Sequence, residues 1–293
     1  MAVEIVVAAD VRCEVGEGVF WDEAAQALWF VDIPAGRLHR LADDVLDHWD
    51  FGEPLGCLAI GRLGLPVLAL KSGIHRFDPE TGEKALLGHP EPDRPGNRFN
   101  DGAVDRQGRL WVGSMKMGAP PERTGAFYRF DPDFSSHLYW DGVFTTNGMA
   151  FSPDGKTMYL SDSNPEVRTI WACDYDGTTG APSNRRVFFD TRQVAGRPDG
   201  ATVDADGCYW MAGVGGWQLV RITPGGAIDR VVDMPCEKPS RPWFGGPRRD
   251  ILYVTSIGAG LTPGTESRQP HAGALYAIHG LGVAGLAQPR FAG

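Results

Sequence analysis

Glu17, Asn147 and Asp199 each stand immediately before a glycine in a similar phrase of sequence, and Asp101, with Asn100 beside it, has the same place in another copy. If the copies are repeats of one structural unit, these side chains point towards one small volume. Two carboxylates and one or two amides that converge without a basic partner repel one another and are costly to bury. A divalent cation resolves that conflict. The oxygen ligands favour a hard ion such as calcium, magnesium or manganese, and so small a set leaves positions for water and substrate.

The phrase that carries these residues recurs roughly every 40 to 50 residues, the period of a four-stranded propeller blade. It consists of glycine and small residues, an apolar strand, a polar turn and a second apolar strand. Copies begin at Glu17, Leu55, Asp101, Asn147, Asp199 and Phe244. A second pair of strands with alternating apolar and polar residues follows each copy. Six copies predict an all-β fold, a six-bladed β-propeller with a central metal-binding channel.

In a propeller the innermost strand of each blade runs along the channel, so the residue before each opening glycine belongs to one ring. That position is expected to be filled by Glu17, Leu55, Asp101, Asn147, Asp199 and Phe244. Asn-Gly and Asp-Gly are also the strongest turn dipeptides, which offers a simpler reason for Asn147 and Asp199. Glu17 has no turn preference and yet sits at the same phase, which favours the metal ring.

Length and composition exclude other classes of protein. Hydrophobic residues at 42% and charged residues at 22% are typical of a globular chain. The net charge of −9 and the lack of a long basic run predict no nucleic-acid partner and no anionic membrane partner. The most apolar stretch, 63–70, contains a glycine and a proline and is far shorter than the roughly 20 residues of a spanning helix. No Pro- or Ser-rich linker is present, so residues 1–293 are expected to form a single domain, its ring closed by the N-terminal strand near 4–8.

Other chemistries fit the sequence less well. The histidines form no H-x-x-x-H pair, no G-x-S-x-G elbow is present, and the D-x-D-G runs lack the final glutamate of a calcium loop. The five cysteines are odd in number and widely spaced, which indicates reduced structural thiols. The N-terminal residues lack the basic and apolar regions of a signal peptide, so the cytoplasm is the expected location.

Six phrases together resemble the regucalcin (senescence marker protein), gluconolactonase and luciferin-regenerating enzyme family. They are GEGVFW at 16–21, LWFVDIPAGRLHR at 28–40, NRFNDGAVDRQGRLWVGSM at 97–115, TTNGMAFSPDGKTMYLSDS at 145–163, RPDGATVDADG at 197–207 and RQPHAGALYAI at 268–278. The resemblance covers nearly the whole chain, in order. It implies a six-bladed propeller that binds one divalent metal ion in its channel and hydrolyses sugar lactones.

The resemblance also assigns residues. Glu17, Asn147 and Asp199 match the family's metal ligands, and Arg98 and Asn100 match its substrate-contacting pair. A guanidinium fork suits the hydroxyl and carbonyl oxygens of an aldonolactone. The metal, which the sequence leaves open among calcium, zinc, manganese, magnesium and iron, would polarise the lactone carbonyl and activate water, with Asp199 as the catalytic general base.

Two positions depart from the family pattern. Val19 replaces a proline, and Lys116 lies in the 115–124 segment, where some members carry an acidic residue that binds sugar hydroxyls. Lys116 would favour an anionic substrate group or would be an ordinary surface lysine. The alternatives to a lactonase are a metal-dependent hydrolase of an aryl ester or phosphotriester and a non-catalytic calcium-binding regulatory propeller. The oligomeric state is not readable from the sequence.

Overall fold

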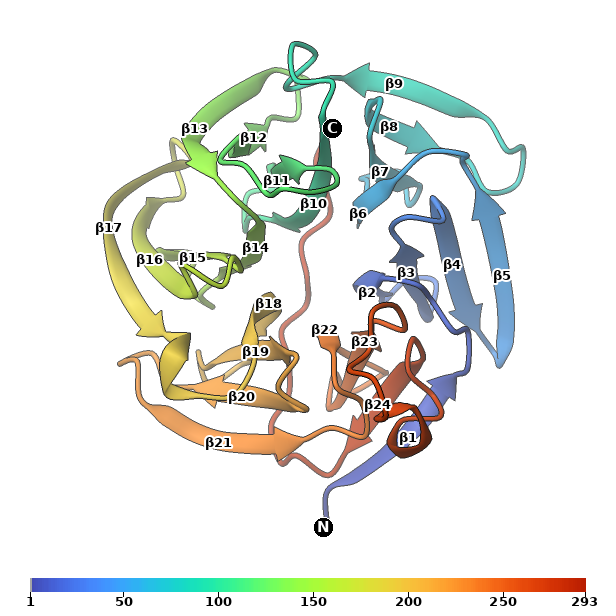
Figure 1. Cartoon of the computed structure of the whole chain (residues 1–293). Helices are drawn as coiled ribbons and strands as arrows, with labels where there is room; N and C mark the ends of the chain where they lie inside the picture. The colour runs from blue at the N-terminus through green and yellow to red at the C-terminus, as the bar shows by residue number, and fades with distance from the viewer. Residues whose placement is uncertain (1) are drawn as a thin grey trace.

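The structure, a computed structural model, describes residues 2–293, which form six four-stranded antiparallel sheets arranged in a ring (Figure 1). This confirms the predicted six-bladed β-propeller. The innermost strands of the sheets are β2 (Gly16–Asp22), β6 (Leu55–Ile60), β10 (Asn97–Val104), β14 (Thr146–Phe151), β18 (Arg197–Val203) and β22 (Pro239–Gly245). The second strands are β3 (Ala27–Asp32), β7 (Pro66–Leu70), β11 (Leu110–Lys116), β15 (Thr157–Asp162), β19 (Tyr209–Val214) and β23 (Ile251–Ser256).

Two further strands complete each sheet. The third strands are β4 (Arg37–Ala42), β8 (Gly73–Phe77), β12 (Gly125–Phe130), β16 (Thr169–Asp176), β20 (Gln218–Ile222) and β24 (Leu275–His279). The outermost strands are β5 (Val45–Asp50), β9 (Lys84–Gly88), β13 (Ser136–Val143), β17 (Ala181–Asp190), β21 (Ile228–Asp233) and β1 (Glu4–Ala9). Only two short 3-10 helices, η1 (Thr191–Gln193) and η2 (Glu266–Arg268), occur among residues 2–293.

The strands are built by local sequence signals and then packed between neighbouring blades. The turns between first and second strands use Asp-Gly pairs such as 154–155 and 206–207, whose glycines have φ of +66° and +84°. The inner strand β6 is buried along its whole length and is almost continuously apolar, whereas every position of the outer strand β5 is exposed or half-buried. Large aromatic side chains fill the space between blades, with Trp111 and Trp210 fully buried. No helix in the described part of the chain is long and apolar enough to cross a membrane.

Each inner strand is interrupted by a β-bulge near its start. The pairing register shifts after Glu17 in β2, after Asn147 in β14 and after Pro198 in β18. A bulge bends the strand and redirects the side chains beside it. Gly18 and Gly148, which follow the first two of these residues, have φ of +59° and +67°, a conformation that favours glycine. In these two blades the glycine of the repeated phrase is thus required by the backbone conformation at the bulge.

The N-terminal strand β1 and the last three strands of the chain, β22, β23 and β24, share one sheet. β1 pairs antiparallel with β24, from Glu4 opposite His279 to Ala9 opposite Leu275. After β24 the chain crosses the ring as the C-terminal segment, residues 280–293, drawn in red in Figure 1. It is held at the far ends of the inner strands: Phe291 N donates to Ile60 O at 2.9 Å, and Arg290 Nη2 donates to Asp22 Oδ1 at 2.8 Å. The repeat pattern did not predict this segment.

Candidate metal centre and active site

Glu17 lies at the start of β2 and is almost fully buried, with 5% of its surface exposed. Its Oε2 accepts a hydrogen bond from Gly18 N at 2.9 Å, while its Oε1 is buried and has no hydrogen-bond partner among the described residues. Burial, followed by the negative charges of Asp199 and Asp101, raises the pKa of Glu17 well above its usual value. A buried carboxylate oxygen without a donor is costly, and a cation is the ligand that it fits.

Asp199 lies on the bulge of β18 and is 7% exposed. Burial and then the charge of Asp101 raise the pKa of Asp199 to about 7, although three arginines act in the opposite direction. Because the Asp199 charge also raises the pKa of Glu17, the two carboxylates face the same part of the channel. Two neighbouring carboxylates with raised pKa values are typical of a functional site.

Asn147 and Asn100 belong to one hydrogen-bonded chain. Arg98 Nη1 donates to Asn100 Oδ1 at 2.7 Å, Asn100 Nδ2 donates to Asn147 Oδ1 at 3.1 Å, and Asn147 Nδ2 donates to Ser163 Oγ at 2.6 Å. Ser163 Oγ in turn donates to Pro198 O, next to Asp199. The chain therefore connects the predicted substrate pair to the predicted ligands across three blades.

Arg98 is a cation of the channel that keeps free hydrogen-bond donors for a substrate. Its Nη1 also donates to Phe99 O at 2.9 Å, and no carboxylate among the described residues forms an ion pair with it. Burial lowers the pKa of Arg98 to about 10, and the charges of Glu17 and Asp199 act against this shift. The guanidinium stays protonated at neutral pH, and its Nε and Nη2 remain available as donors.

The expectation that the ring lacks a basic partner is wrong. Arg241 of β22 donates to Asp101 Oδ1, and both side chains are 2% exposed or less. Phe244, which was predicted for the sixth ring position, lies three residues beyond Arg241 along β22. It packs in the hydrophobic core and is 2% exposed. The error arose because the phase was counted from the glycine of FGG, whereas the bulge of β22 falls between Pro239 and Pro242. The signal that was missed is an arginine inside an otherwise apolar phrase, PSRPWF.

The donor set fits a divalent metal ion. Asp101 is engaged by Arg241, so the ring offers two free carboxylates, Glu17 and Asp199, and the amide oxygen of Asn147. No cluster of three His, Cys, Asp or Glu side chains that could hold a metal occurs in residues 2–293, since the third oxygen here comes from an amide. Two carboxylates balance a 2+ ion, and the unpartnered Glu17 Oε1 marks where it would bind.

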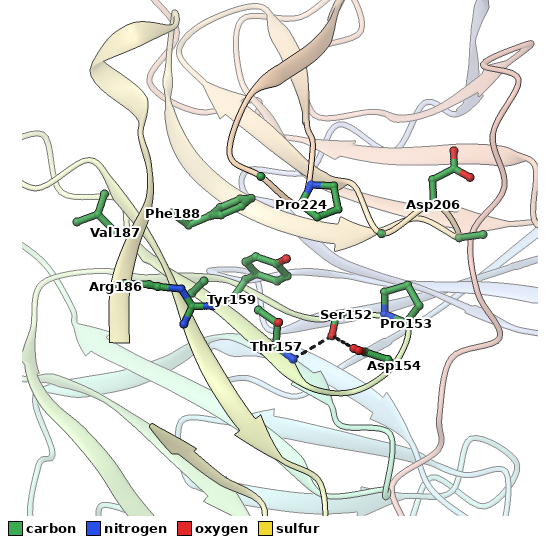
Figure 2. Close-up of a pocket in the computed structure, with 14 residues that line it drawn as sticks. Ser152, Pro153, Asp154, Thr157, Tyr159, Arg186, Val187, Phe188, Asp206 and Pro224 are labelled. Carbon is green, nitrogen blue, oxygen red and sulfur yellow. Dashed lines mark hydrogen bonds between the residues drawn. The ribbon is translucent and has the colours of Figure 1, made fainter. Parts of the chain in front are cut away.

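The surface also has a cavity of about 490 Å³ between the sheets of β14 and β18 (Figure 2). It is lined by the turn that contains Ser152, Pro153 and Asp154 and by Phe188 and Pro224. Ser152 Oγ donates to Asp154 Oδ1 at 2.6 Å, so these polar groups satisfy each other. None of the predicted site residues lines this cavity.

Fold and site together define a six-bladed β-propeller with buried carboxylate and amide side chains gathered at the starts of its inner strands. The family model "SMP-30/Gluconolactonase/LRE-like region" matches residues 15–258, and the chain belongs to this family. The resemblance found in the motifs is therefore confirmed.

Characterised relatives match over almost their whole length. The chain is 36% identical over 287 residues to regucalcin of Xenopus laevis, covering 96% of this chain and 95% of the relative. It is 35% identical over 281 residues to 6-deoxy-6-sulfogluconolactonase of Pseudomonas putida (95% and 95% covered) and 36% identical over 290 residues to L-arabinolactonase of Azospirillum brasilense (97% and 94%).

Two solved structures have closely similar folds. The structure of a luciferin-regenerating enzyme superposes with a TM-score of 0.91 at 29% identity, covering 99% of this chain and 100% of that one. Regucalcin from Agrobacterium tumefaciens, described as a calcium-binding protein, superposes with a TM-score of 0.91 at 28% identity, covering 97% and 96%. The family thus includes both lactonases and a calcium-binding protein.

Proposed function

We propose that this protein hydrolyses a sugar lactone to the aldonic acid with the help of one divalent metal ion held by Glu17, Asn147 and Asp199. The observation that carries the proposal is the unpartnered, buried Oε1 of Glu17 beside a second buried carboxylate. The lactonase names of two relatives that match 95% and 97% of the chain support the reaction.

The substrate would be positioned by Arg98 and Asn100. Arg98 uses Nη1 for Phe99 O and Asn100 Oδ1, which leaves Nε and Nη2 to donate to ring hydroxyls or to the lactone carbonyl. Because Asn100 is held by both Arg98 and Thr146 O, the pair is fixed before the substrate arrives. Such preorganised donors orient the lactone at little entropic cost.

Asp199 would act as the general base. A divalent ion bound in the ring supplies Lewis-acid polarisation of the lactone carbonyl and lowers the pKa of the attacking water. Asp199 accepts the water proton as the water oxygen bonds to the carbonyl carbon, and it returns that proton to the ring oxygen when the ring C–O bond breaks. The role requires that one Asp199 oxygen stays free of the metal.

The test is hydrolysis of gluconolactone, galactonolactone, xylonolactone and arabinonolactone in a pH-indicator assay. Chelator-stripped protein is measured first, then protein with each divalent ion restored, and spontaneous hydrolysis is subtracted. We expect metal-dependent turnover of one lactone, lost in Glu17→Gln and retained in the exposed control Glu4→Gln. Absence of turnover with every ion, in protein that binds the ion, contradicts the proposal.

A calcium-binding role without catalysis is the second candidate, favoured by the description of the Agrobacterium tumefaciens regucalcin as calcium-binding. Calcium binding without lactone turnover in the same experiment would select it. We also place the protein in the cytoplasm, because its five cysteines are buried and unpaired. Cell fractionation tests that location.

A further inference from the structure

Arg241 has no place in the proposed reaction, yet it lies beside the proposed metal site. Its Nη1 pairs with Asp101, and its Nη2 donates to Gly102 O at 3.2 Å. Asp101 is held further by Gly102 N at 2.7 Å and Met149 N at 3.0 Å. The Arg241 side chain is 2% exposed and is therefore almost completely enclosed by protein.

The stem of Arg241 passes next to Gly200, the residue that follows Asp199. A Cβ placed on Gly200 would lie 2.3 Å from Arg241 Cδ, so only glycine leaves room for the arginine there. Arg241 Nε is buried and has no hydrogen-bond partner among residues 2–293. A buried guanidinium with an unpaired N–H is costly, and a pair selected for stability alone does not account for that cost.

The charges explain why a cation at this position matters. The channel contains three buried carboxylates, Glu17, Asp101 and Asp199. The Arg241 charge acts on all three, since it opposes the rise in the pKa of each. With Arg241 present, Asp101 is neutralised and the free charge of the ligand set is that of Glu17 and Asp199. Without it, a third negative charge would attract the same ion.

We propose that Arg241 is a built-in cation that sets the metal affinity of the channel, because it neutralises Asp101 and thereby weakens binding of the ion held by Glu17, Asn147 and Asp199. The inference rests on the proposed metal-dependent function. Arg241 thus keeps the affinity of the site for the metal ion below the value that three charged carboxylates would give, so that the ion remains exchangeable.

The experiment is a double-mutant cycle on the full chain: wild type, Arg241→Met, Asp101→Asn and the double variant. The dissociation constants of Ca²⁺ and Mn²⁺ are measured by calorimetry on chelator-stripped protein. We expect Arg241→Met to bind about tenfold more tightly than wild type and Asp101→Asn about tenfold more weakly, since one buried charge is gained or lost near the ion. The double variant should bind within about threefold of wild type, because both charges are gone.

The cycle also allows for a folding defect in one of the variants. Arg241→Met leaves Asp101 buried and unpaired, so its thermal unfolding temperature should fall without metal and rise more than that of wild type when metal is added. If it fails to fold, Asp101→Asn and the double variant still differ only in the Arg241 charge. Tighter binding by the double variant supports the proposal, and equal or weaker binding overturns it. Arg241→Lys, which keeps the charge, should bind as wild type does.

The outcomes separate this inference from the proposed function. If wild type binds neither ion, the metal-dependent function and the role of Arg241 both fail. If wild type binds metal but the four affinities are equal, or if Arg241→Met weakens binding and loss of Asp101 does not reverse it, only the role of Arg241 is overturned.

Discussion

Buried carboxylates at the two ends of the inner strands differ in how many hydrogen-bond donors surround them. At the start of β2, Glu17 has one oxygen without a donor. Just beyond the end of β18, Asp204 is fully buried and accepts hydrogen bonds from Cys208 N at 2.9 Å, Trp210 Nε1 at 2.8 Å and Arg221 Nε at 2.8 Å. A buried carboxylate with a full set of donors holds the fold together, whereas one without them awaits a ligand.

In another blade both buried carboxylates of one inner strand have donors. Asp105, which follows β10, is fully buried and accepts from Tyr175 OH at 2.5 Å and Arg109 Nη1 at 2.9 Å. Asp101, on the same strand but at the channel, is paired with Arg241, and its charge acts on Glu17 and Asp199. Among the fully buried carboxylate oxygens of residues 2–293, Glu17 Oε1 is the one without a hydrogen-bond partner.

The largest effect is expected at the unpaired end. Asp199→Asn should lower lactone turnover by about 10³-fold, in the range of general acid–base catalysis, and should weaken metal binding. The metal-free variant should be at least as stable as wild type, because a neutral amide removes the cost of burying a charge. Turnover numbers and thermal unfolding check both parts. Unchanged turnover would remove the general-base role of Asp199.

At the paired end the effect should appear in stability and not in activity. Arg221→Met leaves Asp204 buried without its cation and should lower the free energy of unfolding by about 3 kcal/mol. Urea unfolding of the metal-loaded protein measures this. Arg186→Met, which breaks an ion pair with Asp174 whose side chains are both 52% exposed, is the control and should cost less than about 1 kcal/mol. A loss of turnover per folded molecule in Arg221→Met would contradict the idea that Asp204 and Arg221 serve stability and not activity.

His39 is a buried base that also lacks a full set of hydrogen-bond partners. It is 5% exposed, its Nδ1 lacks a partner among the described residues, and burial lowers its pKa to about 4. The folded protein therefore binds fewer protons than the unfolded chain between pH 6.5 and 4. Stability present above pH 6.5 should be lost as the pH falls through this window, by up to about 3 kcal/mol.

The variant His39→Phe isolates this contribution. It keeps a ring that can stack on Phe30, as His39 does at 4.7 Å between centroids, but it cannot be protonated. Its unfolding free energy should fall less than that of wild type between pH 6.5 and 4. Equal slopes in denaturant titrations across this range would show that His39 does not contribute.

The smallest effect is expected on the 115–124 segment. Lys116 is 24% exposed and pairs with Glu122, which is 52% exposed. Lys116→Gln should change the unfolding free energy by less than about 1 kcal/mol, and Glu122→Gln should do the same. Neither should alter the KM for a neutral lactone, as initial rates would show. An increase in KM confined to anionic lactones would instead give Lys116 the substrate contact that its position allows.

Much of the architecture follows from local pattern, and the particular residues show why. The Asp-Gly turns at 154–155 and 206–207 and the repeated strand pairs predict six blades, and the blades are present. Phase in the repeat also selected Glu17, Asn147 and Asp199, whose role as metal ligands stays a prediction. It failed at Phe244, because the bulge in β22 comes earlier in the strand than the glycine suggests.

The sequence by itself determined the strands, the turns and the family, because each depends on residues a few positions apart. The tertiary structure alone decided which buried charges meet. Arg241 and Asp101 are 140 residues apart, and Arg290 reaches Asp22 across 268. Such pairs depend on how far each strand slides at its bulge and on how six blades close around one channel, and no local spacing encodes that geometry.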